Sequence, residues 1–321
     1  MIRILMASAA LAAAMMPMAA SAQTIDLSTP AGAIAANRKI HCSTVDGEPV
    51  VYHWSGRVFA RAPGVPDRHV FNVEGMNVRQ CGTVTDPARG TGYRLVSREL
   101  MIYLDPRTNQ VLRTWTNPET DKVVKVIHVA NDPVNSRPTY KRMADGSPFR
   151  FSGRVNQGWV FLPFEAPLFY VNPLGGDYQE YVGNQYHAME IFDFSVREDD
   201  LLDASRPRAD ASIAWVRISP WLPWMGMGGR PGGLVFNAVG QTMANGIEGL
   251  PQVLRDEIAT NYPDYVTPPP LNDARPNETS WTYFRKVFDA ERAAAQSRIA
   301  YLSPWGWEDR HLTGAVRNCS A

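Results

Sequence analysis

Runs of alternating apolar and polar residues fill the first two-thirds of the chain, and this period of two is typical of β-strands with one buried face. Turn-forming Pro, Gly, Asn and Asp residues separate the runs. The predicted strands are residues 49–54, 57–61, 93–104, 111–116, 123–129, 149–154, 159–164, 187–197, 212–219 and 233–242. Because the connections are short, we expect neighbouring strands to pair in antiparallel fashion.

The turns give the clearest local signal. Residues 105–109 and 117–121 share one pattern, which is Asp or Asn, then Pro, then a polar pair, and finally Asn109 or Asp121. Pro presets φ for a turn, and Asn and Asp tolerate the left-handed conformation that closes it. These turns predict an antiparallel meander from the third to the fifth strand. Ser55-Gly56 predicts another tight hairpin, between the first two strands.

The last third of the chain changes to helical spacing. Residues 250–260 carry apolar side chains four positions apart, and residues 280–296 place three aromatic side chains, beginning with Trp281, on one stripe. Ser280 is of a residue type that caps helices. We therefore expect two helices near the C-terminus.

These elements predict a mainly β (α+β) fold, in which a large antiparallel sheet curls into a barrel-like or sandwich core with two or more C-terminal helices. A wide sheet tends to curl, and closure removes its exposed edges, so we expect barrel-like closure. A sandwich of two sheets fits the same pattern. No linker divides the chain, and we expect residues 23–321 to form a single β-rich domain with a helical C-terminal part.

The N-terminal segment has the pattern of a secretory signal peptide. Arg3 precedes an apolar stretch over 4–20, and Ala20-Ser21-Ala22 fits a cleavage site after Ala22. A membrane anchor is the alternative, but the stretch is short and Ala-rich for a bilayer core of about 30 Å. No other run reaches 18 apolar residues. We expect a periplasmic or secreted protein with no integral membrane segment after processing.

Export makes disulfide formation the default for the three cysteines. Cys42 and Cys81 both lie in strand-like sequence and form the preferred pair, while pairing of Cys42 with Cys319 stays open. In the chain-entropy model, the preferred bridge would stabilise the fold by roughly 3–4 kcal/mol.

Charge and missing motifs exclude several classes of function. The 321 residues include 32 Lys and Arg against 32 Asp and Glu, and this balance argues against a nucleic-acid binder. Residues 226–231 fail the dinucleotide fingerprint because Pro231 replaces its third Gly. The chain has no phosphate-binding loop, no Gly-x-Ser-x-Gly elbow and no His-Glu-x-x-His motif, and its cysteine spacings match no zinc site. We therefore expect no cofactor and no metal.

Residues 187–197 carry apolar side chains on both faces, which indicates that one face borders an enclosed interior. Glu190 shares its face with aromatic residues, where burial would raise its pKa and suit it to proton transfer. A structural ion pair between Glu190 and Arg217 is the alternative. His187 and Asp193 share the opposite face, roughly 20 Å apart along an extended strand, so any cooperation between them needs other strands.

His128 follows two valines on one face of its strand, and we include it with Glu190, His187 and Asp193 among the candidate catalytic residues. A hydrogen-bonded core histidine is the alternative interpretation. His53, between two aromatic residues, is equally ambiguous.

Residues 215–233 combine three Trp and two Met with Pro and Gly, so they either line a ligand or plug the end of a barrel. Arg217 and Arg230 would hold a carboxylate or phenolate of that ligand. A second aromatic cluster surrounds the Gly175-Gly176 loop and suits the stacking of a flat substrate. The candidate ligand-binding residues of the two clusters are Trp215, Arg217, Trp221, Trp224, Met225, Tyr181 and Tyr186.

Four runs in the sequence carry a resemblance, and they are YLDPRTNQVLRTWTNPET, HVANDPVN, SPWLPWMGMGGRPGGLVFNA and PNETSWTYF. Together they resemble a family of exported bacterial proteins known only as a domain of unknown function, number eighteen-thirty-eight. The resemblance implies one domain over about residues 35–300, a bacterial source and export. It implies no reaction and no catalytic residue.

We therefore expect an exported protein that binds an apolar or aromatic small molecule in an interior cavity, as a cofactor-independent acid–base enzyme of the lyase, isomerase or hydrolase type. A non-catalytic periplasmic carrier of a hydrophobic ligand and an envelope interaction protein are the alternatives. The enzyme hypothesis predicts that Glu190 and at least one of His53, His128 and His187 line the same interior space as Trp215.

Overall fold

The structure, a computed structural model, describes residues 24–176, 178 and 183–302. The predicted signal peptide, Tyr181 and Cys319 lie outside the described residues. In the described part of the chain, no helix combines the length and the apolar character that crossing a membrane requires.

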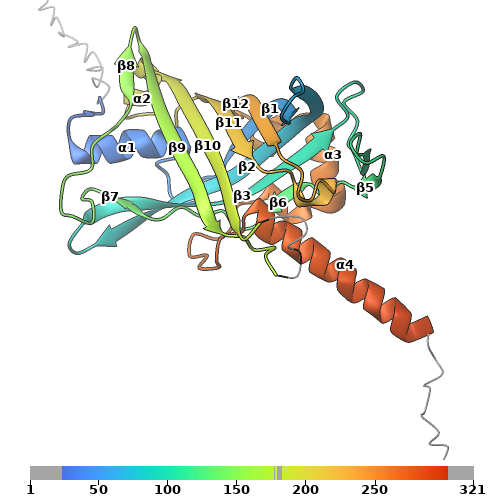
Figure 1. Cartoon of the computed structure of the whole chain (residues 1–321). Coiled ribbons are helices and arrows are strands. Elements are labelled where there is room, and N and C mark those ends of the chain that lie inside the picture. Colours follow the sequence, from blue (N-terminus) through green and yellow to red (C-terminus); the bar gives the residue numbers. More distant parts are fainter. Residues whose placement is uncertain (1–23, 177, 179–182, 303–321) are drawn as a thin grey trace, which may run out of the picture.

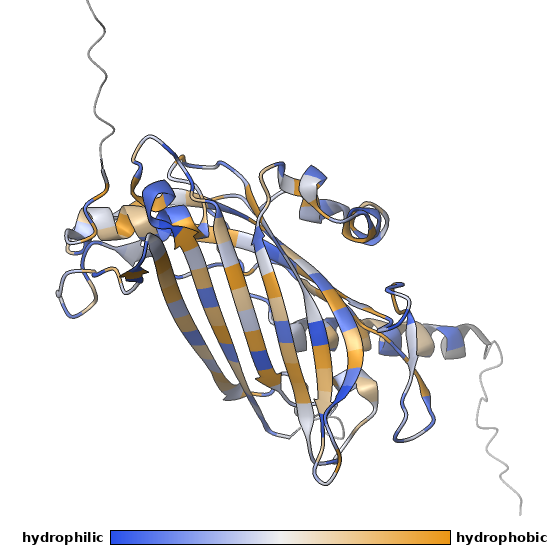
Figure 2. Cartoon of the chain, turned by 90° about the horizontal axis from the view of Figure 1, so that it is seen from above, coloured by the Kyte–Doolittle hydropathy of each residue, from blue (hydrophilic) through white to orange (hydrophobic). Residues whose placement is uncertain are grey.

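One antiparallel sheet of ten strands dominates the fold, with the order β6-β3-β2-β1-β12-β11-β10-β9-β8 and β7 paired with β3. Apolar and polar residues alternate along its strands (Figure 2). The strands are β1 Val50–Arg61, β2 Arg68–Asp86, β3 Gly90–Leu104, β6 Val129–Asn131, β7 Thr139–Tyr140, β8 Arg154–Asn156, β9 Trp159–Val171, β10 Gln185–Arg197, β11 Ala211–Ser219 and β12 Gly233–Thr242. A separate hairpin joins β4 (Thr114–Thr116) to β5 (Val123–Lys125).

The sheet curls strongly but does not close, because the strand order is an open path with β6 and β8 at its ends. Figure 1 shows β9 and β10 in front of β2 and β3, with the interior between them. The prediction of a mainly β fold with a large curled antiparallel sheet and C-terminal helices is confirmed, whereas full barrel closure is not observed.

The helices occupy the ends and one outer face of the curled sheet. They are α1 Pro30–His41, α2 Glu198–Leu202, α3 Gln252–Asn261 and α4 Ser280–Leu302, with short 3-10 turns at η1 Pro223–Met225, η2 Gly246–Gly249 and η3 Pro263–Val266. On the outer face, Leu254 and Ile258 of α3 pack against Met76 and Leu100 of β2 and β3. The first turn of α4 is buried and its second half is exposed.

Two packed clusters fill the interior. One contains residues of α1 together with Tyr52 and Phe194, and the other contains Trp215, the η1 segment and Trp281 of α4. Phe192 packs against both clusters. The space between the clusters is where the candidate site lies.

The predicted turns fold as expected. Asn109, Asp121 and Gln157 all have positive φ, between 49° and 57°, and the amide of Asp121 bonds the carbonyl of Asn117. The predicted meander is only partly realised, since the strands after β3 form the separate β4–β5 hairpin. Thr279, and not Ser280, caps α4, because its Oγ1 accepts the Thr282 amide at 3.2 Å.

The expected hairpin at Ser55-Gly56 is wrong, because β1 runs through both residues. Gly56 pairs with Val73 on one side and Ala238 on the other. A Cβ on Gly56 would lie 2.3 Å from the Asn237 carbonyl oxygen. Gly at this position therefore permits close contact between neighbouring strands and does not form a turn. The sequence prediction also missed β2, the longest strand, and α1.

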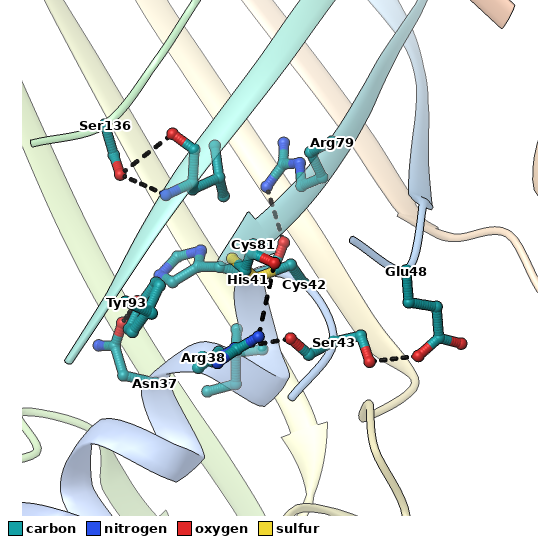
Figure 3. Close-up of a disulfide and its surroundings, with 12 residues drawn as sticks. Asn37, Arg38, His41, Cys42, Ser43, Glu48, Arg79, Cys81, Tyr93 and Ser136 are labelled. Carbon is teal, nitrogen blue, oxygen red and sulfur yellow. Dashed lines mark hydrogen bonds between the residues drawn. A yellow bond between two sulfur atoms is a disulfide. The ribbon is translucent and has the colours of Figure 1, made fainter. Parts of the chain in front are cut away.

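The preferred disulfide is confirmed. Cys42 follows α1 and bonds Cys81 of β2, with a Cα–Cα distance of 6.1 Å (Figure 3). Arg38 supports this junction, because its Nε donates to the Ser43 carbonyl at 2.7 Å and its guanidinium pairs with Asp46. The bridge therefore fixes α1 against one end of the sheet.

Candidate functional site

A cavity of about 270 Å³ lies inside the curled sheet, between the two packed clusters. Sites for drug-sized ligands typically measure about 300–1,000 Å³, so this cavity suits a smaller molecule. Its lining residues come from strands β1–β3, β6 and β9–β11, from the loop after β6, and from the start of α4 and the segment before it. They are Tyr52, Trp54, Asn77, Arg79, Glu99, Asn131, Val134, Leu168, Tyr170, Glu190, Phe192, Phe194, Ile213, Trp215, Arg217, Asn277, Glu278, Thr279 and Ser280.

Aromatic rings form much of the wall. Trp54 of β1 and Trp215 of β11 meet edge to face, with ring centroids 6.4 Å apart, and Phe192 stacks on Trp215 at the same separation. Gly75 makes room for this wall, because a Cβ at that position would lie 2.2 Å from the Trp54 ring. The cavity therefore presents flat apolar surfaces suited to a planar ligand.

On one wall of the cavity, two charged residues form an ion pair with each other. Arg217 and Glu190 are direct cross-strand partners on β11 and β10, and Arg217 Nη1 lies 3.4 Å from Glu190 Oε1. Nη2 of Arg217 donates to the hydroxyl of Tyr186. This is the ion pair that sequence analysis weighed as the alternative role for Glu190, although both residues also line the cavity.

The facing wall carries Glu99, whose neighbours across β2 and β6 are Asn77 and Asn131. Within the described residues, no hydrogen bond or ion pair reaches the Glu99 carboxyl group. Burial, together with the charge of Glu190, raises the pKa of Glu99 to about 7, against the opposing influence of Arg217 and Arg79. Glu99 can therefore both accept and donate a proton near neutral pH.

Two segments, residues 131–135 and 277–280, meet beside the cavity. Asn277 exchanges hydrogen bonds with the backbone of Asn135, at 2.8 and 2.6 Å. The amide of Glu278 donates to the Pro133 carbonyl at 2.8 Å, and its carboxylate accepts the Asp132 amide at 3.0 Å. Two of the four runs quoted above thus meet at the cavity, which explains why sequences so far apart belong to one pattern.

The structure brings together only some of the predicted site residues. Glu190, Trp215 and Arg217 line the cavity, and Tyr186 supports Arg217 from behind. His187 lies exposed on the outer face against Phe169, with ring centroids 5.6 Å apart.

Asp193 and His53 line a groove on the outer face of the sheet. There, His53 Nε2 lies 2.5 Å from Glu74 Oε2. None of His53, His128 and His187 is among the described residues that line the cavity, so Glu190 does not share this space with a histidine.

His128 is a buried core histidine, the alternative that sequence analysis considered. Its Nδ1 accepts the Tyr103 amide at 3.2 Å and its ring stacks on the Tyr103 ring. Burial lowers the pKa of His128 to about 4, so the ring is neutral at pH 7.

Most of the Trp- and Met-rich segment is packed core. Trp221, Trp224 and Met225 are buried in the larger interior cluster, where Trp224 contacts Phe71 and other rings, and they do not line the cavity. The exposed Arg230 donates from Nη2 to the carbonyl of Glu119. These residues therefore match the alternative interpretation of the segment, in which it is a structural plug.

Sequence analysis missed Glu99, Trp54, Asn77 and Arg79. The sequence did mark Glu99 as a candidate, because it lies on the same face of a predicted strand as Met101. An acidic residue on an apolar strand face is unusual, as it is for Glu190. Arg79 and Asn77 lie on the strand that was not predicted.

No group of three or more His, Cys, Asp or Glu side chains suited to a metal occurs in the part of the chain that the structure covers. No curated protein and no solved structure matches this sequence. The model of the family described as Protein of unknown function (DUF1838) matches residues 47–288, which include every described residue that lines the cavity. The chain therefore belongs to this family, as the quoted runs predicted.

Proposed function

We propose that this protein is an exported, cofactor-independent enzyme that binds a small aromatic molecule in the cavity and transfers a proton on it, as a lyase, isomerase or hydrolase. The observation that carries the proposal is the unpaired carboxyl group of Glu99 in an aromatic cavity. Such a site places apolar rings around a ligand and leaves one group free to act on it.

The two glutamates have different environments, which suits them to different roles. Arg217 forms an ion pair with Glu190 at 3.4 Å, whereas Glu99 has no such partner among the described residues. Glu99 is therefore the proton donor and acceptor, and the Glu190–Arg217 pair fixes the electrostatic field on the opposite wall. Glu99 takes the place of the histidine that the sequence led us to expect.

A predicted signal peptide and the Cys42–Cys81 disulfide support an exported protein. The disulfide is compatible with an oxidising compartment such as the periplasm. Secretion beyond the cell would fit the same two features.

A carrier is the second candidate, and the pairing of Glu190 with Arg217 favours it, because a closed ion pair needs no catalytic role. The third candidate, an envelope interaction protein, predicts apolar surface and no enclosed cavity. Phe169, Val171 and Val239 are exposed on the outer face, yet the cavity is present as well.

The test begins with the native exported protein. Small molecules that copurify with it are extracted, identified by mass spectrometry and returned to fresh protein. We expect the wild type to convert the bound compound, and Glu99→Gln to bind it but convert it at least about a hundredfold more slowly. Glu165→Gln, an exposed glutamate on β9, is the matched control and should keep full turnover.

Two results would count against the proposal. Recovery of the ligand unchanged from the wild type would favour a carrier. Full turnover by Glu99→Gln would remove Glu99 from the chemistry.

A further inference from the structure

Five charged residues of the described ranges line the cavity, and three of them form ion pairs. Glu190 pairs with Arg217, and Glu278 pairs with Lys286 at 2.5 Å. The other two are Arg79 and Glu99, and no ion pair joins either of them to a described residue. Since the guanidinium is charged at every relevant pH, Arg79 brings to the cavity wall a positive charge that forms no ion pair with a described residue.

The position of Arg79 is fixed from three sides. Its Nη1 donates to the His41 carbonyl at 3.3 Å (Figure 3). Its Nε donates to Asn77 Oδ1 at 2.6 Å, and its guanidinium lies over the Tyr52 ring at 4.5 Å. Within the described structure, no hydrogen bond reaches its Nη2. These contacts orient the guanidinium, and all three are made to uncharged groups.

Asn77 adds a second donor beside Arg79. Its Oδ1 is occupied by Arg79, whereas no described residue accepts from its Nδ2. Asn77 lies directly across from Glu99 in the β2–β3 register. Guanidinium, amide and carboxyl groups therefore follow one another along a single wall of the cavity.

We propose that the ligand of this cavity is a small aromatic carboxylic acid, whose carboxylate is bound by Arg79 and Asn77 so that its neighbouring atoms face Glu99. The inference rests on the proposed function and adds the chemical class of the substrate. Arg217, which sequence analysis selected as the carboxylate handle, is engaged by Glu190 and Tyr186, so Arg79 takes that role. A ligand carboxylate at this position would pair with the Arg79 guanidinium and accept a hydrogen bond from Asn77 Nδ2.

The inferred ligand also couples binding to protonation. A carboxylate near Glu99 favours the neutral form of that side chain, because like charges repel. The charged groups that face Glu99 are Arg79 on β2, Glu190 on β10 and Arg217 on β11. Affinity for the anion should therefore fall as the pH rises above about 7.

The test compares two probes of the same shape, 2-naphthoate and 2-naphthamide, by fluorescence or calorimetric titration of the full protein. Charge-assisted hydrogen bonds imply that the wild type binds naphthoate roughly ten- to hundredfold more tightly at pH 6. Arg79→Met should abolish this preference and Arg79→Lys should restore part of it. Arg57→Met, an exposed arginine on β1, is the matched control and should keep it.

The pH dependence gives a readout that does not require removal of Arg79. Naphthoate binding to the wild type should weaken between pH 6 and pH 8, and binding to Glu99→Gln should not. This comparison keeps the inference testable if Arg79→Met fails to fold.

The outcomes separate the two proposals. Equal binding of both probes, or a naphthoate preference that survives Arg79→Met, overturns the carboxylate inference and leaves an aromatic cavity intact. Failure of both probes to bind counts against the proposed function as well. A preference that depends on Arg79 but not on pH refutes the coupling to Glu99.

Discussion

Replacement of Glu99 by Gln should stabilise the protein at alkaline pH, because the wild type carries a carboxyl group that is costly to ionise. The substitution keeps the size and shape of the side chain and removes its charge. Burial and the nearby Glu190 together raise the pKa of Glu99 from 4.5 to about 7 in the folded state. The unfolded chain has no such environment.

The size of the effect follows from this difference. Between pH 4.5 and pH 7 the folded protein binds more protons at Glu99 than the unfolded chain does, so stability falls as the pH rises through this window. At about 1.36 kcal/mol for each tenfold change in acidity, the cost reaches about 3 kcal/mol above pH 7. Below pH 4 both states are protonated, and the cost disappears.

Urea denaturation at a series of pH values measures this cost. The difference in unfolding free energy between Glu99→Gln and wild type should grow from near zero at pH 4 to about 3 kcal/mol at pH 8. The exposed Glu165→Gln variant controls for the general loss of one negative charge. A pH-independent difference, or a variant less stable than wild type at pH 8, would refute the assignment of Glu99 as a buried, unpaired acid.

Three further perturbations test other parts of the structure. Cys42→Ser should lower the free energy of unfolding by about 4 kcal/mol under oxidising conditions, since the bridge closes a loop of 39 residues, and added reductant should remove the difference. Gly75→Ala should displace the Trp54 ring and weaken probe binding in the cavity at a cost of about 1–3 kcal/mol in stability, and an unchanged probe affinity would contradict the described wall. Glu257→Gln should cost about 2 kcal/mol at pH 7, because Glu257 accepts two hydrogen bonds from Arg113. The pKa of Glu257 is lowered mainly by that arginine against the effect of burial, so this cost should shrink in urea titrations as the pH falls below about 4.

Local chemistry made some features predictable from the sequence. Asn109 and Asp121 adopt left-handed backbone because their side chains tolerate it, and the two proline turns could be located without tertiary information. The strand-like runs over residues 187–197 and 212–219 likewise located β10 and β11. Such signals depend on a residue and its neighbours in sequence.

Features set by strand register were not predictable in this way. Ser55-Gly56 has the composition of a turn, yet close contact with β12 is the reason for Gly at that position. The placement of Glu99 opposite Asn77 and across the cavity from Glu190 depends on how β3 pairs with β2 and on the curl of the whole sheet. Neither can be derived from the pattern of one strand.

The surroundings of the histidines likewise could not be predicted from the sequence pattern of one strand. Periodicity placed His187 and Glu190 on opposite faces of one strand, and the structure agrees. Periodicity could not show which face borders the cavity. It also could not show that the Tyr103 amide would donate a hydrogen bond to His128. Those outcomes depend on packing between distant segments.

The most direct measurement is an NMR titration of the Glu99 carboxyl carbon, assigned by comparison with Glu99→Gln. An unpaired acid inside the cavity should titrate with a midpoint near 7, and saturating 2-naphthoate should move that midpoint upward. A midpoint near 4.5 that the ligand leaves unchanged would contradict the claim that Glu99 is the proton-transferring group of this site.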